Sequence, residues 1–274
     1  GTSSGSAYIF VRSGTTWTQQ AKLLASDAAT EDNFGFNVGI HGDYAIVGAW
    51  KNDDGGTDSG SAYIFVRSGT SWTQQARLRA SDAADNDYFS GSSGLAIDGD
   101  YAVVGAYFND DAGGESGSAY IFVRSGTTWT QQAKLVASDA AGSDFFGISA
   151  AIKEEYVIIG TMRDDVPGQS ESGSAYVFKR SGTSWTQQHK LIASDAAADD
   201  YFGTVVAISG KTIMVGAYAN DDAGSSSGSA YIFEGGLGTS IGTREVEKWE
   251  SNINLDVSGN IYFCGDIIKN GSVI

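Results

Sequence analysis

The sequence has very little cysteine, proline, histidine and basic charge. One Cys, one Pro and two His occur in 274 residues, and a single Cys excludes an internal disulfide framework and a cysteine-rich zinc site. Seventeen Lys and Arg oppose 33 Asp and Glu, for a net charge of -16, whereas nucleic-acid binding needs a concentrated basic surface. No run approaches the roughly 20 apolar residues that span a bilayer. We therefore expect no nucleic-acid partner and no membrane insertion.

An internal repeat organises the chain. The motif GSAYIF, or GSAYVF, begins at Gly5, Gly60, Gly117, Gly173 and Gly228, at spacings of 55, 57, 56 and 55 residues. The second unit carries two extra residues and the third carries one, so the underlying period is 55. Periods of this size are typical of propellers and other repeat architectures. The length corresponds to just under five units.

Each unit contains four short runs rich in β-branched and aromatic residues, bounded by Gly, Asp and Ser. In the first complete unit they begin at Phe34 (FGFNVGI), Tyr44 (YAIVGAW), Ser61 (SAYIFVR) and Trp72 (WTQQARLRA). Tight glycine turns between the first and second runs favour antiparallel hairpins. Four-stranded units of this length, repeated around a circle, are typical of a β-propeller. We predict an all-β, five-bladed β-propeller of four-stranded antiparallel blades.

The repeat resembles the FG-GAP family, which forms the blades of integrin α-subunit propellers and of bacterial and viral relatives. Phe89-Ser90 and Gly160-Thr161 depart from its pattern. The resemblance implies that the FG strand is innermost, followed by the GA strand, the AYIF strand and the Trp strand. It also implies binding or adhesion in an extracellular setting. The matching FG and GA elements are Phe34-Gly35, Phe146-Gly147, Phe202-Gly203, Gly48-Ala49, Gly105-Ala106 and Gly216-Ala217.

In that blade order the chain starts in mid-blade, because the N-terminal hairpin supplies only the third and fourth strands. The run LDVSGNIYFCGDI from Leu255 aligns without gaps to VGIHGDYAIVGAW from Val38. We therefore predict one domain over residues 1–274, with the last blade shared between residues 1–26 and 251–274. Such closure removes open sheet edges. The alternative is that the tail belongs to a following element or to an oligomer contact. The chain begins with Gly and no signal-peptide pattern follows, which indicates a mature or excised chain.

Acidic residues are expected to gather on one face of the propeller. Connections alternate between the two faces, so loops joining the second strand to the third share a face with the loops between blades. These loops hold 22 of the 33 acidic residues. Such a face attracts cations and basic partners in a salt-dependent way.

Paired aspartates in these loops are candidate metal ligands. Clustered carboxylates suit calcium, and repulsion between neighbours needs solvent or a cation to relieve it. In the FG-GAP resemblance, however, calcium belongs to a long loop between the first and second strands, which is a short turn here. For the recurring SDAAxxD pattern, the alternative is that aspartates accept backbone N–H groups in turns. The candidate ligands are Asp53, Asp54, Asp110, Asp111, Asp164, Asp165, Asp221 and Asp222.

Aromatic residues recur at two places. Each Trp that begins a fourth strand either covers the seam between blades or stacks on sugars, and we favour the seam. At the mouth of the acidic face Trp50, Tyr107 and Tyr218 follow the GA elements and are candidate ligand-binding residues.

These features predict a non-enzymatic binding or adhesion module, extracellular or on a cell or virion surface, whose acidic face meets a protein or glycan ligand with calcium as the candidate cofactor. One alternative is a structural or assembly subunit of a surface fibre or virion. Another is a glycan-processing enzyme, which needs unique carboxylates that break the repeat. The off-repeat residues His41 and His189 form no such constellation.

Overall fold

The computed structural model describes residues 1–234, 268–269 and 272–273, and all regular structure in these residues is β-strand. Three antiparallel sheets have four strands each and follow the chain order from the inner edge outward. The first contains β3 (Val38–His41), β4 (Tyr44–Ala49), β5 (Ser61–Ser68) and β6 (Ser71–Leu78); the second β7 (Leu95–Asp98), β8 (Tyr101–Ala106), β9 (Ser118–Ser125) and β10 (Thr128–Leu135); the third β11 (Phe146–Lys153), β12 (Tyr156–Thr161), β13 (Ser174–Ser181) and β14 (Ser184–Leu191).

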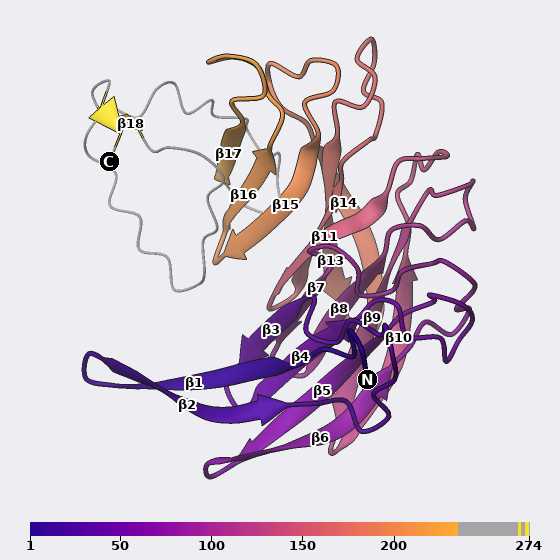
Figure 1. Ribbon diagram of the computed structural model, residues 1–274. Coiled ribbons are helices and arrows are strands. Elements are labelled where there is room, and N and C mark those ends of the chain that lie inside the picture. The colour runs from indigo at the N-terminus through magenta and orange to yellow at the C-terminus, as the bar shows by residue number, and fades with distance from the viewer. Residues whose placement is uncertain (235–267, 270–271, 274) are drawn as a thin grey trace.

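Partial sheets stand at both ends of this series. The N-terminal hairpin pairs β1 (Ala7–Ser13) with β2 (Thr16–Leu23), and the last large sheet contains β15 (Phe202–Ser209), β16 (Thr212–Ala217) and β17 (Ser229–Glu234). A short hairpin of β18 (Ile268–Lys269) and β19 (Ser272–Val273) completes the described strands. Figure 1 shows the sheets fanned in chain order, with β1–β2 and β15–β17 at the two ends of the arc. The structure confirms the predicted all-β class with four-stranded antiparallel sheets, an arrangement consistent with a propeller.

The core lies in layers between neighbouring sheets. Ile46 and Ile64 of the first sheet share one buried cluster with Val104 and Tyr120 of the second, and two similar clusters join the second sheet to the third and the third to the fourth. The middle strands β4, β8 and β12 are therefore buried on both faces, which explains their continuous apolar sequences. The outer strand β6 is mostly exposed or half-buried, and only its last residue, Leu78, is buried.

The FG and GSAY elements join each sheet to the next. The Phe89 N–H donates to the Ser59 carbonyl at 2.9 Å, and equivalent bonds join Phe146 to Ser116 and Phe202 to Ser172. The Phe89 ring meanwhile packs edge-on against Phe122 of its own sheet, with ring centroids 6.0 Å apart. The repeated motif therefore anchors a blade internally through its side chain and to the preceding blade through its backbone.

The expected first strands are shorter than the sequence predicts in two units. The third and fourth units begin their inner strands at the FG phenylalanine, but β3 and β7 begin only at Val38 and Leu95. The preceding stretches form turns instead, with hydrogen bonds such as Gly91 N–H to the Tyr88 carbonyl. In the second unit the two inserted residues make this Gly- and Ser-rich stretch too long for uninterrupted pairing.

Apolar side chains are exposed on the N-terminal hairpin and on the inner strand β3. Tyr8 and Phe10 of β1 are 47% and 54% exposed, whereas their counterparts Tyr63 and Phe65 in β5 are 0% and 3% exposed. On β3, Ile40 is 60% exposed while its counterpart Ile97 is 7% exposed. Among the described residues β1 pairs only with β2. The predicted closing segment, residues 251–274, lies outside the described residues except for β18 and β19, so the ring is not seen closed.

Candidate functional site

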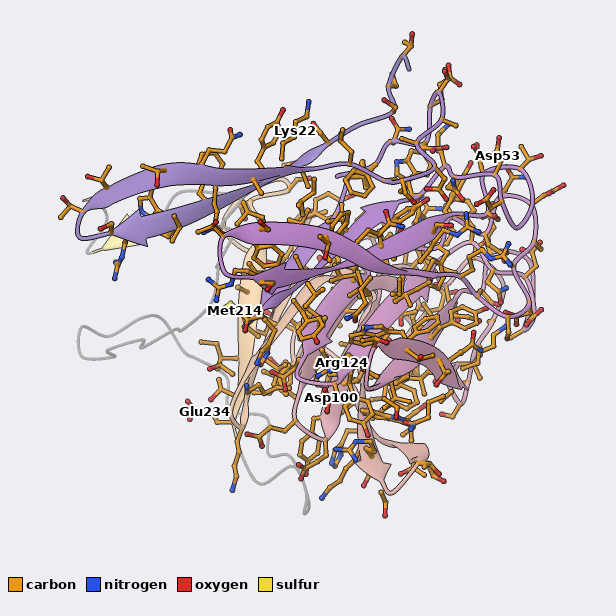
Figure 2. The ribbon with its side chains drawn as sticks, turned by 90° about the horizontal axis from the view of Figure 1, so that it is seen from below. Lys22, Asp53, Asp100, Arg124, Met214 and Glu234 are labelled. Carbon is orange, nitrogen blue, oxygen red and sulfur yellow. The ribbon has the colours of Figure 1, made fainter. Side chains whose placement is uncertain are left out.

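Two sets of loops meet at one end of the sheets. Loops between the second and third strands contact the following inter-blade loop, as where the Asn86 N–H donates to the Thr57 carbonyl at 2.7 Å and the Thr57 N–H donates to Asp85 Oδ1 at 2.8 Å. Figure 2 shows Asp53 at this end and Glu234 at the opposite end. The two acid-rich sets of loops therefore share one surface, which we call the loop face.

One aspartate in each inter-blade loop is buried and fastens its own turn. The Ala84 N–H donates to Asp87 Oδ2 at 2.9 Å, and Asp87 is 3% exposed. Desolvation raises the pKa of this carboxyl, and the bond from Ala84 only partly opposes that effect. The prediction that these aspartates accept backbone N–H groups is confirmed. The equivalent acceptors are Asp32, Asp144 and Asp200.

The paired aspartates lie on the loop face and have two kinds of partner. One carboxylate of each pair accepts a backbone N–H within its own loop, as when the Asp58 N–H donates to Asp53 Oδ1 at 2.8 Å. The equivalent acceptors are Asp110, Asp165 and Asp221. These bonds give the carboxylates a structural role in holding each loop.

The other carboxylates receive cations from the outer strands. Lys190 binds Asp139 at 2.7 Å and Asp164 at 2.6 Å. In the same way Lys134 joins Asp82 to Asp111, and Arg77 joins Asp27 to Asp54. The chain itself thus supplies the charge that relieves carboxylate repulsion in three copies.

In the fourth copy Asp195 and Asp222 make no ion pair within residues 1–234, and the fourth strand, which carries the cation in the other copies, lies outside the described residues. The hydrogen bond between Asp222 and Asp195 raises the pKa of Asp222, with repulsion adding to the effect. Across the part of the chain that the structure describes, no three His, Cys, Asp or Glu side chains form a group able to hold a metal. In each of the first three copies, one candidate ligand is already paired with a lysine or arginine of the chain.

Asp164 occupies a different place from the other paired acids. It aligns with the buried Asn52, Asn109 and Asn220, since its carbonyl accepts the N–H of Gly173 as theirs accept the N–H of the equivalent glycines. It therefore faces Asp144, whose pKa is raised to about 6, first by burial and then also by the charge of Asp164. These groups, with Arg163 and Lys190, line an open pocket of about 290 Å³ on the loop face.

Aromatic side chains form a continuous row across three sheets on the loop face. Ring centroids lie 4.9 Å apart between Trp50 and Tyr88, 5.0 Å between Tyr88 and Phe108, and 5.0 Å between Phe108 and Phe145. Tyr107 packs against Phe108 at 4.6 Å. We call Trp50, Tyr88, Tyr107, Phe108 and Phe145 the aromatic row.

Two of the three predicted ligand-binding residues are thus brought together, and one is not. Trp50 and Tyr107 belong to the aromatic row, whereas Tyr218 is 53% exposed and stacks on Tyr201 at 5.4 Å. Sequence reasoning missed Tyr88, Phe108 and Phe145. Tyr88 and Phe145 each directly precede the FG phenylalanine or its counterpart, so the recurrence of an aromatic residue at that position was the signal that could have found these two.

The tryptophans of the fourth strands lie between sheets. Trp129 Nε1 donates to Gln75 Oε1 of the preceding sheet at 3.0 Å, and equivalent bonds join Trp72 to Gln20 and Trp185 to Gln132. The seam interpretation is confirmed for these three. Trp17 is 64% exposed, and no sheet precedes it in the chain.

Comparison with known proteins agrees with this geometry. A family model described as the FG-GAP repeat matches four segments, residues 17–65, 72–122, 129–178 and 185–233. A search of curated protein sequences finds no match. No helix long and apolar enough to cross a membrane occurs within the described residues. FG-GAP repeats are typical of extracellular or surface proteins, and they suggest a module that binds or adheres. Four matched repeats, joined through their own FG, GA and GSAY elements, cover most of the sequence, and the chain belongs to the FG-GAP repeat family.

Proposed function

We propose that the protein is a non-enzymatic binding or adhesion module, extracellular or on a cell or virion surface, whose loop face meets a protein or glycan ligand. The observation that supports this most is the aromatic row, which lies among carboxylates on that face. The positions of the two histidines support the non-enzymatic part of this proposal. His41 Nδ1 lies 2.8 Å from Asp98, in the turns away from the loop face, and His189 lies in the outer strand β14.

Binding arrays test this function. Wild-type protein would be applied to immobilised glycans and peptides, beside Trp50→Ala and, as control, Trp17→Ala. Trp50 lies in the aromatic row, whereas Trp17 lies in the N-terminal hairpin. We expect a ligand whose binding falls at least tenfold in Trp50→Ala and is unchanged in Trp17→Ala. Equal binding by all three proteins, or hydrolysis of a glycan, would contradict the proposal.

Calcium is proposed for the fourth copy, where the side chains of Asp195 and Asp222 lie within hydrogen-bond distance of each other. Elsewhere calcium would have to displace lysine or arginine from the same carboxylates. A ligand that binds only the folded state raises the melting temperature. Calcium should therefore raise the melting temperature of the wild type above its value in EDTA, and Asp222→Asn should abolish the difference. Identical melts of the wild type in calcium and EDTA would exclude the site.

We also propose that residues 251–274 complete the N-terminal blade and close a five-bladed ring. The exposed Tyr8, Phe10 and Ile40 support this, because their counterparts in complete blades are buried. Deleting residues 251–274 should abolish the cooperative melt. The control deletes residues 268–274, which lie beyond the segment that aligns with β3–β4. Similar melts for the two deletions would contradict closure.

The same exposed side chains favour a second candidate, a structural subunit. In that case they are covered by a neighbouring copy, and head-to-tail contacts of this kind generate rings or filaments. Sedimentation of the protein over a wide concentration range distinguishes a binding module that closes on itself from a structural subunit. A monomer at every concentration would exclude the structural role.

A further inference from the structure

Cation sites recur on the loop face, and comparison of the copies shows which of them are filled. In the first sheet the Lys51 ammonium lies 3.4 Å from Asp58 and 4.9 Å from the centroid of the Trp50 ring. In the third sheet the Arg163 guanidinium lies 3.6 Å from Glu171 and 4.7 Å from the centroid of the Phe145 ring. Each cation therefore rests between an aromatic face and the carboxylate that precedes the Ser-Gly of its loop.

The second sheet keeps the carboxylate but has an aromatic side chain in place of the cation. Phe108 stands at the position of Lys51 and Arg163, which is the second residue after the GA element or its Gly160-Thr161 counterpart. Glu115 stands at the position of Asp58 and Glu171, and its backbone accepts the Phe145 N–H at 3.2 Å. Within the described residues the Glu115 carboxylate has no ion pair and no side-chain hydrogen bond. In the same sheet the Phe108 ring packs against Tyr107, and it stacks on Phe145 of the third sheet.

We propose that this second-copy site takes the ammonium or guanidinium group of a lysine or arginine side chain from a partner protein. Resting on the proposed function, this inference names the partner's chemistry. A cation over an aromatic face gains electrostatic attraction from the ring, and the adjacent carboxylate adds a charged acceptor. The net charge of -16 is complementary to a basic partner and speeds its approach.

Differences among the copies support the choice of surface. The outer-strand sequence TQQ after each Trp is the same in all four units, whereas the two positions after the GA element read Trp-Lys, Tyr-Phe, Met-Arg and Tyr-Ala. The outer-strand residues form the seams described above. The varied positions lie on the loop face, where a change of side chain alters what the surface can bind without disturbing a seam.

Fluorescence anisotropy with labelled hexa-arginine and hexalysine at 150 mM salt tests the site. Phe108→Lys fills it from within the chain, and Glu115→Gln removes its carboxylate. The matched controls are Ala219→Lys, which adds the same charge at the equivalent position of the fourth copy, and Asp199→Asn, which removes an exposed carboxylate elsewhere on the loop face. We expect both site variants to weaken binding roughly tenfold and both controls to change it less than threefold. Glu115→Gln alters only a surface side chain and keeps the test valid if Phe108→Lys does not fold.

Other outcomes separate the two proposals. If all four variants weaken binding equally, the attraction is general and the second-copy site is wrong, while the binding function stands. If neither peptide binds but a neutral oligosaccharide does, the site is again wrong and the function stands with a glycan ligand. If nothing binds on peptide or glycan arrays, both proposals fail.

Discussion

At the residue scale, glycines let neighbouring sheets approach each other closely. A Cβ atom added at Gly105 of the GA element would lie 2.0 Å from the carbonyl oxygen of Gly147 in the next FG element. Gly147 has a φ of +95°, a conformation that L-residues rarely adopt. The glycines of the two elements are therefore required by the same contact between backbones.

Gly105→Ala should lower the free energy of unfolding by about 3 kcal/mol or more, because the new methyl group meets backbone that cannot move without opening the seam. The control is Gly126→Ala in the β9–β10 turn, where a Cβ meets nothing within 4 Å although φ is +63°. That change should cost only about 1 kcal/mol from the left-handed backbone. Urea unfolding measures the free energy of unfolding of both variants. Equal decreases would show that the contact at the seam is not the main reason that Gly105 is required.

Asp144 should make stability fall as the pH rises. Its pKa is about 6 in the folded protein, above the ordinary value of 3.8, because of burial first and then the charge of Asp164. The contribution of Asp144 to the stability of the folded protein is therefore fully present below the ordinary pKa and is lost as the pH rises through about 6. Asp144→Asn keeps the acceptor for the Ala141 N–H. At pH 7.5 we expect Asp144→Asn to raise the free energy of unfolding by about 1 kcal/mol, and so the melting temperature by about 2–4 °C. At pH 4 the melting temperature should change little.

Asp139 provides the opposite sign as a control. Burial raises its pKa, but hydrogen bonds from Lys190 and Tyr176 outweigh burial and leave the pKa below its ordinary value. Its stabilisation is therefore present above the ordinary pKa and is lost as the pH falls. Asp139→Asn should lower the melting temperature at pH 7.5. A rise in both variants at that pH would contradict the assignment.

At the scale of elements, each seam depends on one Trp–Gln pair in addition to its buried core. Trp129 is 9% exposed and bonds to Gln75 across the seam between β10 and β6. A double-mutant cycle of Trp129→Phe and Gln75→Ala should show a coupling of about 1 kcal/mol. The control cycle pairs Trp129 with Gln131, which bonds to Ser81 instead. An equally large coupling energy between Trp129 and Gln131 would show that the Trp129–Gln75 hydrogen bond does not stabilise the seam specifically.

The elements could be predicted from the sequence because each depends on short-range pattern. β-branched runs between glycine turns allowed the bounds of the middle strands to be predicted closely, as at Tyr44–Ala49. The inner strands were less predictable, since pairing of the stretch from Phe34 depends on a bend that alternation does not encode. The cations of the loop face were missed for a related reason. Lys190 lies 51 residues from Asp139 in the chain, and only the packing of neighbouring sheets brings the two side chains together.

At the scale of the whole molecule, the proposed ring closure fixes a register that the single cysteine can test. Val47 pairs with Tyr63 across β4 and β5. The aligned tail places Cys264 at the position of Val47, and β1 places Tyr8 at the position of Tyr63. Directly opposed residues of antiparallel strands have Cα atoms about 4.5–5.5 Å apart, within the range that a disulfide spans.

Tyr8→Cys should therefore form an intramolecular disulfide with Cys264 under mild oxidation, seen by faster migration on a non-reducing gel and by mass spectrometry. Ile9→Cys is the control, because neighbouring residues of a strand point to opposite faces and its thiol should stay free. Tyr8→Cys with Cys264→Ser should also form no intramolecular bond. A free thiol in oxidised Tyr8→Cys would contradict the register. A disulfide-linked dimer would instead place the tail of one copy against the hairpin of another and favour the structural subunit.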